Sequence, residues 1–129
     1  MKRRKPAQLT PRSVKLLRER GYIVGSVEKW IPQTRQRKDL FGFIDLIAVA
    51  HDHVLGVQVT SNDNAAARMT KAKEQPEYPA FIGSKVCRFV VHGWKKPTQT
   101  RRTWEVREIW ADDEALARAI VASKESNNG

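Results

Sequence analysis

Two apolar runs separated by a short polar break place the tightest constraint on how this chain folds. They are FGFIDLIAVA at residues 41–50 and VLGVQVTS at residues 54–61, and each carries a polar residue in its middle, Asp45 in the first and Gln58 in the second. Two runs of this kind around a short turn predict a β-hairpin. If the turn is centred on the dipeptide HD between them, Asp45 and Gln58 are direct cross-strand neighbours, with Cβ atoms about 4.5–5.5 Å apart.

The same register gathers a carboxylate, a carboxamide and a hydroxyl on one face of the hairpin, because Thr60 lies two residues beyond Gln58. An exposed face with ordinary polar side chains is one interpretation. However, the apolar residues Phe43, Ile47 and Val49 share the face of Asp45. A buried polar group without a partner costs roughly 1–3 kcal/mol, and a charge costs more. The pattern therefore favours a metal ion or a solvent-filled cleft beside Asp45. Leu55, Val57 and Val59 point to the opposite face.

The rest of the chain predicts a single α/β domain with a mixed central β-sheet flanked by helices. Thr10 as N-cap and Pro11 at the first helical position predict a helix through residues 12–20 that stops at Gly21. Alternation predicts a strand over residues 22–31, and a polar basic loop follows at 32–39.

The second half continues the alternation of helices and strands. A helix is predicted over residues 64–75, with Ala65, Met69 and Ala72 on one stripe and Pro76 and Pro79 ending it. Strands follow at 86–94 and 103–111, and Asp112 caps a last helix. We expect residues 1–8 to form a flexible basic arm, 9–123 the folded domain and 124–129 a frayed tail.

The charge of the chain indicates a polyanionic partner. Lys and Arg number 24 against 14 Asp and Glu, which gives a net charge of +10. Such a surface attracts nucleic acid through phosphate contacts and counterion release. No window approaches the roughly 18 apolar residues of a membrane span, and no apolar signal-peptide core follows the basic N-terminus. A lone Cys87, expected to be buried, fits a reducing cytoplasm, bacterial or of a phage-infected cell.

With the hairpin residues in place, the chain resembles the PD-(D/E)XK nucleases, the restriction-endonuclease-like superfamily. In that family an Asp belongs to the second strand, and a Glu or Gln followed two residues later by a Lys lies in the third. The segment IDLIAVAHDHVLGVQVT is similar to the version found in Holliday junction resolvases, with Asp45 and Gln58 at the motif positions. The predicted element order also matches the αβββαβ core of the family.

The resemblance implies a metal-dependent DNA endonuclease that acts on double-stranded, branched or phage-related DNA and forms a homodimer. The acidic ligands would hold Mg²⁺ or Mn²⁺ together with the main-chain carbonyl of Val59, since hard cations prefer oxygen ligands. The metal would polarise a phosphodiester and lower the pKa of a bound water. Further carboxylates for the site are expected from Glu28 and Asp39.

The chain departs from the family pattern at the lysine position, where Thr60 stands. Arg68 and Lys71 on the following helix could supply the missing charge, with Lys71 the candidate catalytic residue; both fit equally well as a solvated or DNA-contacting face. The basic residues expected to contact DNA are Arg35, Arg37, Lys38, Arg68, Lys95, Lys96, Arg101 and Arg102. The four tryptophans could stack on bases, although packing is the commoner role for this residue; they are Trp30, Trp94, Trp104 and Trp110.

Two alternatives remain. The chain could be a DNA-binding protein that kept the nuclease fold and lost catalysis with the lysine, or an RNA-binding protein of unrelated α/β fold.

Overall fold

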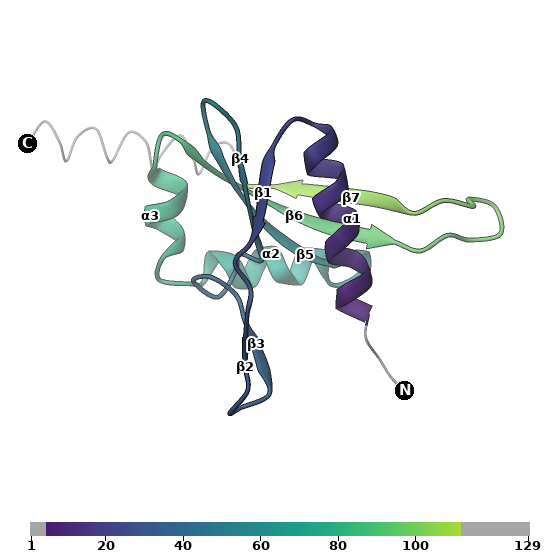
Figure 1. Cartoon of the computed structure of the whole chain (residues 1–129), viewed down its shortest axis with the longest axis horizontal. Helices are drawn as coiled ribbons and strands as arrows, with labels where there is room; N and C mark the ends of the chain where they lie inside the picture. Colours follow the sequence, from purple (N-terminus) through teal and green to yellow (C-terminus); the bar gives the residue numbers. More distant parts are fainter. Residues whose placement is uncertain (1–4, 112–129) are drawn as a thin grey trace, which may run out of the picture.

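A five-stranded mixed sheet forms the centre of the protein in a computed structural model that describes residues 5–111. The strand order is β1-β4-β5-β6-β7 (Figure 1). Strand β5 runs parallel to β6, and the other neighbouring pairs are antiparallel. The strands are β1 (Ile23–Ser26), β4 (Leu46–Val49), β5 (Val54–Ser61), β6 (Cys87–Lys95) and β7 (Glu105–Trp110).

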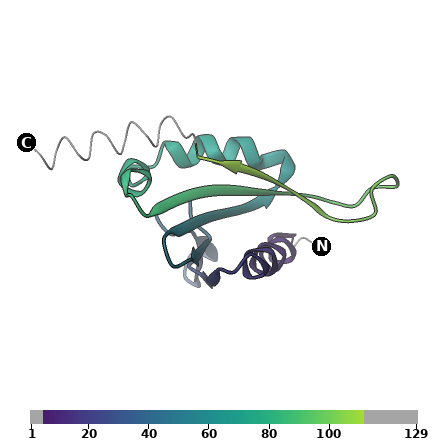
Figure 2. The ribbon, with the colours of Figure 1, turned by 90° about the horizontal axis from the view of Figure 1, so that it is seen from above.

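Helices cover both faces of this sheet, so the fold has three layers (Figure 2). Helix α1 (Lys5–Glu19) lies on one face, and α2 (Ala65–Lys73) and α3 (Tyr78–Gly83) lie on the other. A short 3₁₀ turn, Asn62–Asn64, joins β5 to α2. The predicted class, a single α/β domain with a mixed sheet between helices, is confirmed at this level.

Each face of the sheet has its own apolar core. On the α1 side, Leu17 packs with Leu46, Ala48, Leu55, Val57 and Val90. On the other side, the stripe Ala65, Met69 and Ala72 of α2 is buried as predicted, against Phe43, Ile44, Tyr78, Ile82, Phe89 and Val91. The alternation of β5 is what separates the two cores: its odd-numbered residues face α1 and its even-numbered residues face α2 and α3.

A buried polar network attaches α1 to the sheet. Trp94 donates from Nε1 to Ser13 Oγ over 2.8 Å, and Ser13 Oγ lies 2.8 Å from Nδ1 of His92. Because the serine oxygen accepts from tryptophan, its own proton is free to donate to His92. The other ring nitrogen of His92 then donates to Glu108 over 3.1 Å, and Arg20 binds both oxygens of Glu108. Each polar side chain of this network therefore has a hydrogen-bond partner, although Ser13 and His92 are fully buried.

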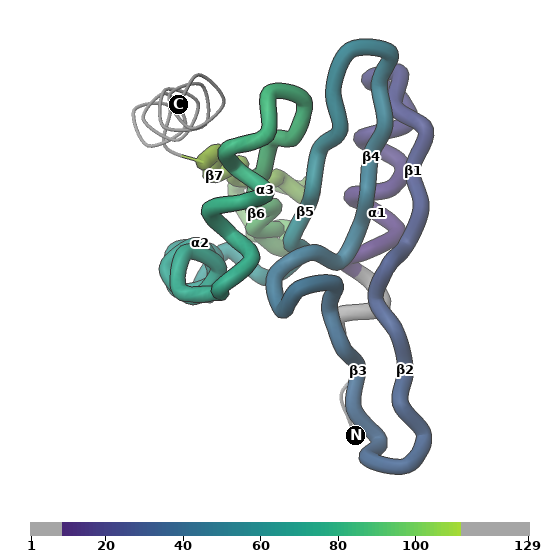
Figure 3. Tube along the Cα trace, turned by 90° about the vertical axis from the view of Figure 1, so that its left-hand side faces the viewer, coloured from purple at the N-terminus to yellow at the C-terminus, as the bar shows by residue number. Residues whose placement is uncertain are grey.

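A second, two-stranded sheet projects from the body of the protein (Figure 3). It is a hairpin of β2 (Lys29–Ile31) and β3 (Gln36–Lys38), and it lies in sequence between β1 and β4, which are neighbours in the main sheet. The predicted strand over 22–31 is therefore wrong in its continuity, and the predicted loop over 32–39 contains a strand. The break follows Ser26, because the N–H of Val27 donates to the carbonyl of Asp45 and the chain then leaves the sheet.

The start of α1 also differs from the prediction. The helix begins at Lys5, so Thr10 is not its N-cap, Pro11 lies inside it, and residues 5–8 of the predicted flexible arm are helical. An internal proline has no N–H to donate and normally disfavours a helix. Packing of Leu17 against the sheet outweighs this local preference. Residues 1–4 lie outside the described range.

Two further differences concern turns. The run 41–50 becomes a strand only from Leu46, because Phe41 and Gly42 adopt positive φ angles of 58° and 81° in a tight turn. Pro79 does not end a helix: it occupies the first turn of α3, where a proline is tolerated, and α3 was not predicted.

Cys87 is half-buried at the start of β6 rather than buried. Among residues 5–111 no helix combines the length and apolar character that crossing a membrane requires. The last predicted helix and the predicted tail at 124–129 lie outside the described residues.

Candidate metal centre

The β4–β5 hairpin has the register that the sequence predicts. Leu46 pairs with Val57 and Val49 with Val54, which leaves a short turn at residues 50–53. Continued by one residue, this register places Asp45 opposite Gln58. Their side chains are in contact, with Nε2 of Gln58 donating to Oδ2 of Asp45 over 2.7 Å. Thr60 lies on the same face of β5 and is buried.

The excursion of the chain into the β2–β3 hairpin brings two more carboxylates to Asp45. Glu28 immediately precedes β2 and Asp39 immediately follows β3, so they stand at the two ends of the hairpin where it joins the body. Leu40 then bridges to Ile44, and the chain re-enters the sheet at Leu46, directly after Asp45. One carboxylate oxygen from each of Glu28, Asp39 and Asp45 lies within 4.8 Å of the others. We call these three residues the acidic cluster.

Asp45 is the buried member of the acidic cluster. Its side chain is only 5% exposed, and its Oδ1 is buried without a hydrogen-bond partner among the described residues. Its Oδ2 accepts from Gln58 and from the N–H of Val59. Burial raises the pKa of Asp45 to about 7, the negative charges of Asp39 and Glu28 add to the rise, and the Val59 N–H opposes it.

These features fit a divalent cation. Three carboxylates this close repel one another in the metal-free protein, and a cation between them would remove the repulsion. The Oδ1 of Asp45, which has no hydrogen-bond partner in residues 9–111, is available as a ligand atom. The carboxamide of Gln58 also donates to Asp39 over 3.4 Å; its amide group partly satisfies the carboxylates, and its oxygen is a potential ligand. The predicted Val59 carbonyl ligand stays a prediction, because the contact that the structure gives for Val59 is made by its N–H.

Arg37 of β3 is a cation in contact with the acidic cluster. Its Nη1 lies 3.0 Å from Oε1 of Glu28. Arg68 and Lys71 lie on α2, and within residues 9–111 no ion pair joins either of them to the acidic cluster. Sequence reasoning assigned Arg37 to DNA contact and gave no sign of its approach to Glu28, because that approach depends on the β2–β3 hairpin.

The other residues predicted to bind DNA divide between two projections of the chain. Arg35, Arg37 and Lys38 lie on the β2–β3 hairpin, while Lys95, Lys96, Arg101 and Arg102 lie at the long β6–β7 connection (Figure 1). Both projections leave the end of the sheet where β4 begins and β5 and β6 end. Arg101 is engaged within its own connection, donating to the carbonyls of Lys96 and Thr103.

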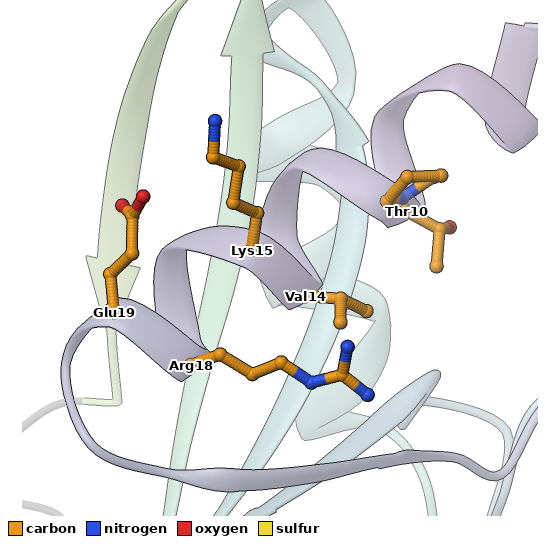
Figure 4. A pocket seen from close by; sticks show the side chains of 6 residues that line it. Thr10, Val14, Lys15, Arg18 and Glu19 are labelled. Carbon is orange, nitrogen blue, oxygen red and sulfur yellow. The ribbon is translucent and has the colours of Figure 1, made fainter.

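A separate open hollow of about 540 Å³ lies over α1 (Figure 4). Its lining is one face of the helix, with Thr10, Pro11, Val14, Lys15, Arg18 and Glu19. No member of the acidic cluster contributes to it, and it contains one carboxylate only. The hollow offers no set of metal ligands and does not compete with the acidic cluster as the functional site.

Comparison of the chain with protein-family models, curated proteins and solved structures finds no match. The case for a function therefore depends on the acidic cluster, the fold and the distribution of charge.

Proposed function

We propose that this protein is a Mg²⁺- or Mn²⁺-dependent DNA endonuclease of the PD-(D/E)XK, restriction-endonuclease-like superfamily. The observation that carries the proposal is the acidic cluster, in which one carboxylate oxygen from each of Glu28, Asp39 and Asp45 lies within 4.8 Å of the others. Asp45 is buried, and its Oδ1 has no hydrogen-bond partner within the described part of the chain. Asp45 and Gln58 were picked out as motif residues from the sequence, and they are in direct contact in the structure.

The topology supports the same proposal. Without the β2–β3 excursion, the order is α1, β1, β4, β5, α2, α3 and β6, with three antiparallel strands followed by a helical crossover to a parallel fourth strand. This agrees with the αβββαβ core of the superfamily, to which α3 and β7 are additions. Asp45 directly precedes the second strand of the core, and Gln58 lies in the third.

In this proposal Asp45, Asp39 and Glu28 hold the metal, and Gln58 contributes its carboxamide oxygen after its amide has turned away from Asp45. When bound, the ion polarises the scissile phosphate and lowers the pKa of a water. Arg37, which already contacts Glu28, neutralises charge on the phosphate. The basic hairpin and the β6–β7 connection hold the flanking DNA backbone on either side.

The direct test is cleavage of linear, supercoiled and branched DNA in Mg²⁺, Mn²⁺ or EDTA. We expect cleavage in the metals only, and a loss of about 100-fold or more in Asp45→Asn, since a metal site supplies several kcal/mol of transition-state stabilisation. Asp63→Asn is the matched control, because Asp63 is an exposed carboxylate on the 3₁₀ turn. Unchanged turnover in Asp45→Asn would rule out the metal centre.

A DNA-binding protein without nuclease activity is the second candidate, favoured by the position of Thr60 where the family keeps a lysine. It predicts tight DNA binding with no cleavage of any form in either metal. Competition with RNA of the same length tests the assignment to DNA in both cases.

A further inference from the structure

The β2–β3 hairpin has an unusual surface for so small an element. Its residues are exposed almost throughout, and the ten residues KWIPQTRQRK from 29 to 38 contain four cations and no acid. An isolated two-stranded hairpin is marginally stable in water. This one projects from the body of the protein (Figure 3).

The cross-strand pairs of the hairpin are arranged for a polyanion. Lys29 lies directly opposite Lys38, and like charges in that relationship destabilise a β-pair. A phosphate backbone along this face would turn the repulsion into attraction. Arg35 at the turn extends the same charge towards the tip.

The other face of the hairpin carries an aromatic platform. Trp30 is 52% exposed and lies directly opposite Arg37. Arg37 reaches back to Glu28, so Trp30, Arg37 and the acidic cluster share one side of the hairpin. Glu28 precedes Trp30 by two residues, which is a rise of about 7 Å along a strand. A group stacked on Trp30 therefore lies beside the metal ligands.

We infer that the hairpin binds an unpaired nucleotide next to the scissile phosphate, with its base stacked on Trp30 beside Arg37, while the phosphate backbone of the adjoining strand lies on the opposite face of the hairpin, along Lys29 and Lys38. The inference rests on the proposed function and defines its substrate class as DNA that exposes a base, such as a bulge, fork or branch. Bases in a continuous duplex are stacked on one another and cannot offer a face to a side chain. Base–aromatic stacking contributes about 1–3 kcal/mol per base and tolerates any sequence.

The test compares binding to three fluorescently labelled DNA duplexes by anisotropy in EDTA, where no cleavage takes place. The first duplex is perfectly paired, the second has one bulged nucleotide, and in the third that nucleotide is abasic. We expect the bulged duplex to bind about tenfold more tightly than the other two. In Trp30→Ala this preference should disappear, and in Trp30→Phe most of it should return.

Trp110→Ala is the matched control, because Trp110 is also half-exposed but lies on β7, away from the hairpin. It should keep the preference. A preference that survives in Trp30→Ala, or an abasic bulge that binds as tightly as the intact one, would overturn the inference. Asp45→Asn should keep the preference in EDTA, so a failure of the metal centre and a failure of the hairpin give different results.

Discussion

Gln58 donates its side-chain amide to the one oxygen of Asp45 that also accepts the Val59 N–H, and the other oxygen has no partner among the residues that the structure describes. In the metal-free protein this amide is the neutral group that separates the carboxylates. Gln58→Glu would replace a donor with another negative charge. We expect it to bind Mg²⁺ about tenfold more tightly by calorimetry, because charge on the ligands raises affinity for a hard cation.

The same substitution should lower the thermal stability of the metal-free protein at neutral pH, since the added carboxylate faces Asp45 without compensation. Gln99→Glu, in the exposed β6–β7 connection, is the control and should change neither quantity. If Gln58→Glu leaves Mg²⁺ affinity as it is, residue 58 does not belong to the metal site.

The raised pKa of Asp45 predicts how stability changes with pH. Since burial and the neighbouring carboxylates hold this pKa at about 7, the folded protein binds the proton more tightly than the unfolded chain. Stability from this group is therefore full at low pH and is lost as pH rises towards the folded pKa. At pH 8 in EDTA, Asp45→Asn should melt about 3 °C or more above the wild type, because 1 kcal/mol shifts a domain of this size by roughly that amount.

The useful measurement is the difference in melting temperature between the variant and the wild type. Both proteins contain His92, whose titration changes stability with pH in the opposite direction to that of Asp45. Burial lowers the pKa of His92 in the folded protein. Its contribution to stability is therefore full above the pKa of the unfolded chain and is lost as pH falls from that pKa to the lower folded one. Saturating Mn²⁺ at pH 8 should raise the melting temperature of the wild type and leave that of Asp45→Asn unchanged. Equal melting of the two proteins in EDTA across pH 5–8 would contradict the buried, charged Asp45.

The register of the β4–β5 hairpin could be predicted from the sequence because a slip of one residue would move every apolar side chain of β5 to the wrong face. Asp45 and Gln58 followed from that register. The position of the other two carboxylates could not be predicted in the same way. Glu28 and Asp39 meet Asp45 only because the chain leaves the sheet after Val27, and a segment as polar as QRK in β3 has no apolar alternation to mark it.

Trp30 shows the same limit. The sequence predicts one continuous strand over residues 22–31, in which a tryptophan would pack, but the structure divides this strand and Trp30 lies on the projecting part. The sequence does contain one sign that Trp30 is exposed. The residues around it, from Lys29 to Lys38, are rich in cations and include only Ile31 as an apolar side chain of the kind that packs in a core.

Ser13 joins two buried groups, and its removal should be costly. Ser13→Ala would leave the Trp94 N–H and Nδ1 of His92 without their partner in a fully buried site. We expect a loss of about 1–3 kcal/mol in the free energy of unfolding by denaturant titration. Thr70→Ala is the control, because Thr70 is an exposed helix residue whose hydroxyl donates to the carbonyl of Ala66; the two variants should not be equal in stability.

The last prediction concerns Arg37, the cation beside the proposed metal site. Arg37 contacts Glu28 over 3.0 Å, whereas Thr60 occupies the family's lysine position. If Arg37 supplies the missing charge, Arg37→Gln should reduce the cleavage rate at saturating DNA by about 10–100-fold, the effect of losing one stabilising donor and its supporting contacts. Arg88→Gln is the control and should leave the rate unchanged, because Arg88 lies at the start of β6 and the acidic cluster lies at the end of the sheet where β6 finishes.

Thr60→Lys then tests whether Arg37 acts through its charge or through its part in the structure of the β2–β3 hairpin. Thr60 is buried on the face of Gln58, so a lysine there would extend its ammonium group towards the acidic cluster. Added to Arg37→Gln, it should restore much of the rate; added to the wild type, it should leave the rate flat or lower it, because two cations would then repel each other. Two results together would show that no residue supplies the family's lysine charge and that Arg37 serves DNA binding alone: Thr60→Lys in the wild type raises the cleavage rate, and Arg37→Gln alone does not lower it. If single and double variants all cleave at the wild-type rate, no cation beside this hairpin takes part, and the proposed mechanism is wrong even if the metal site is right.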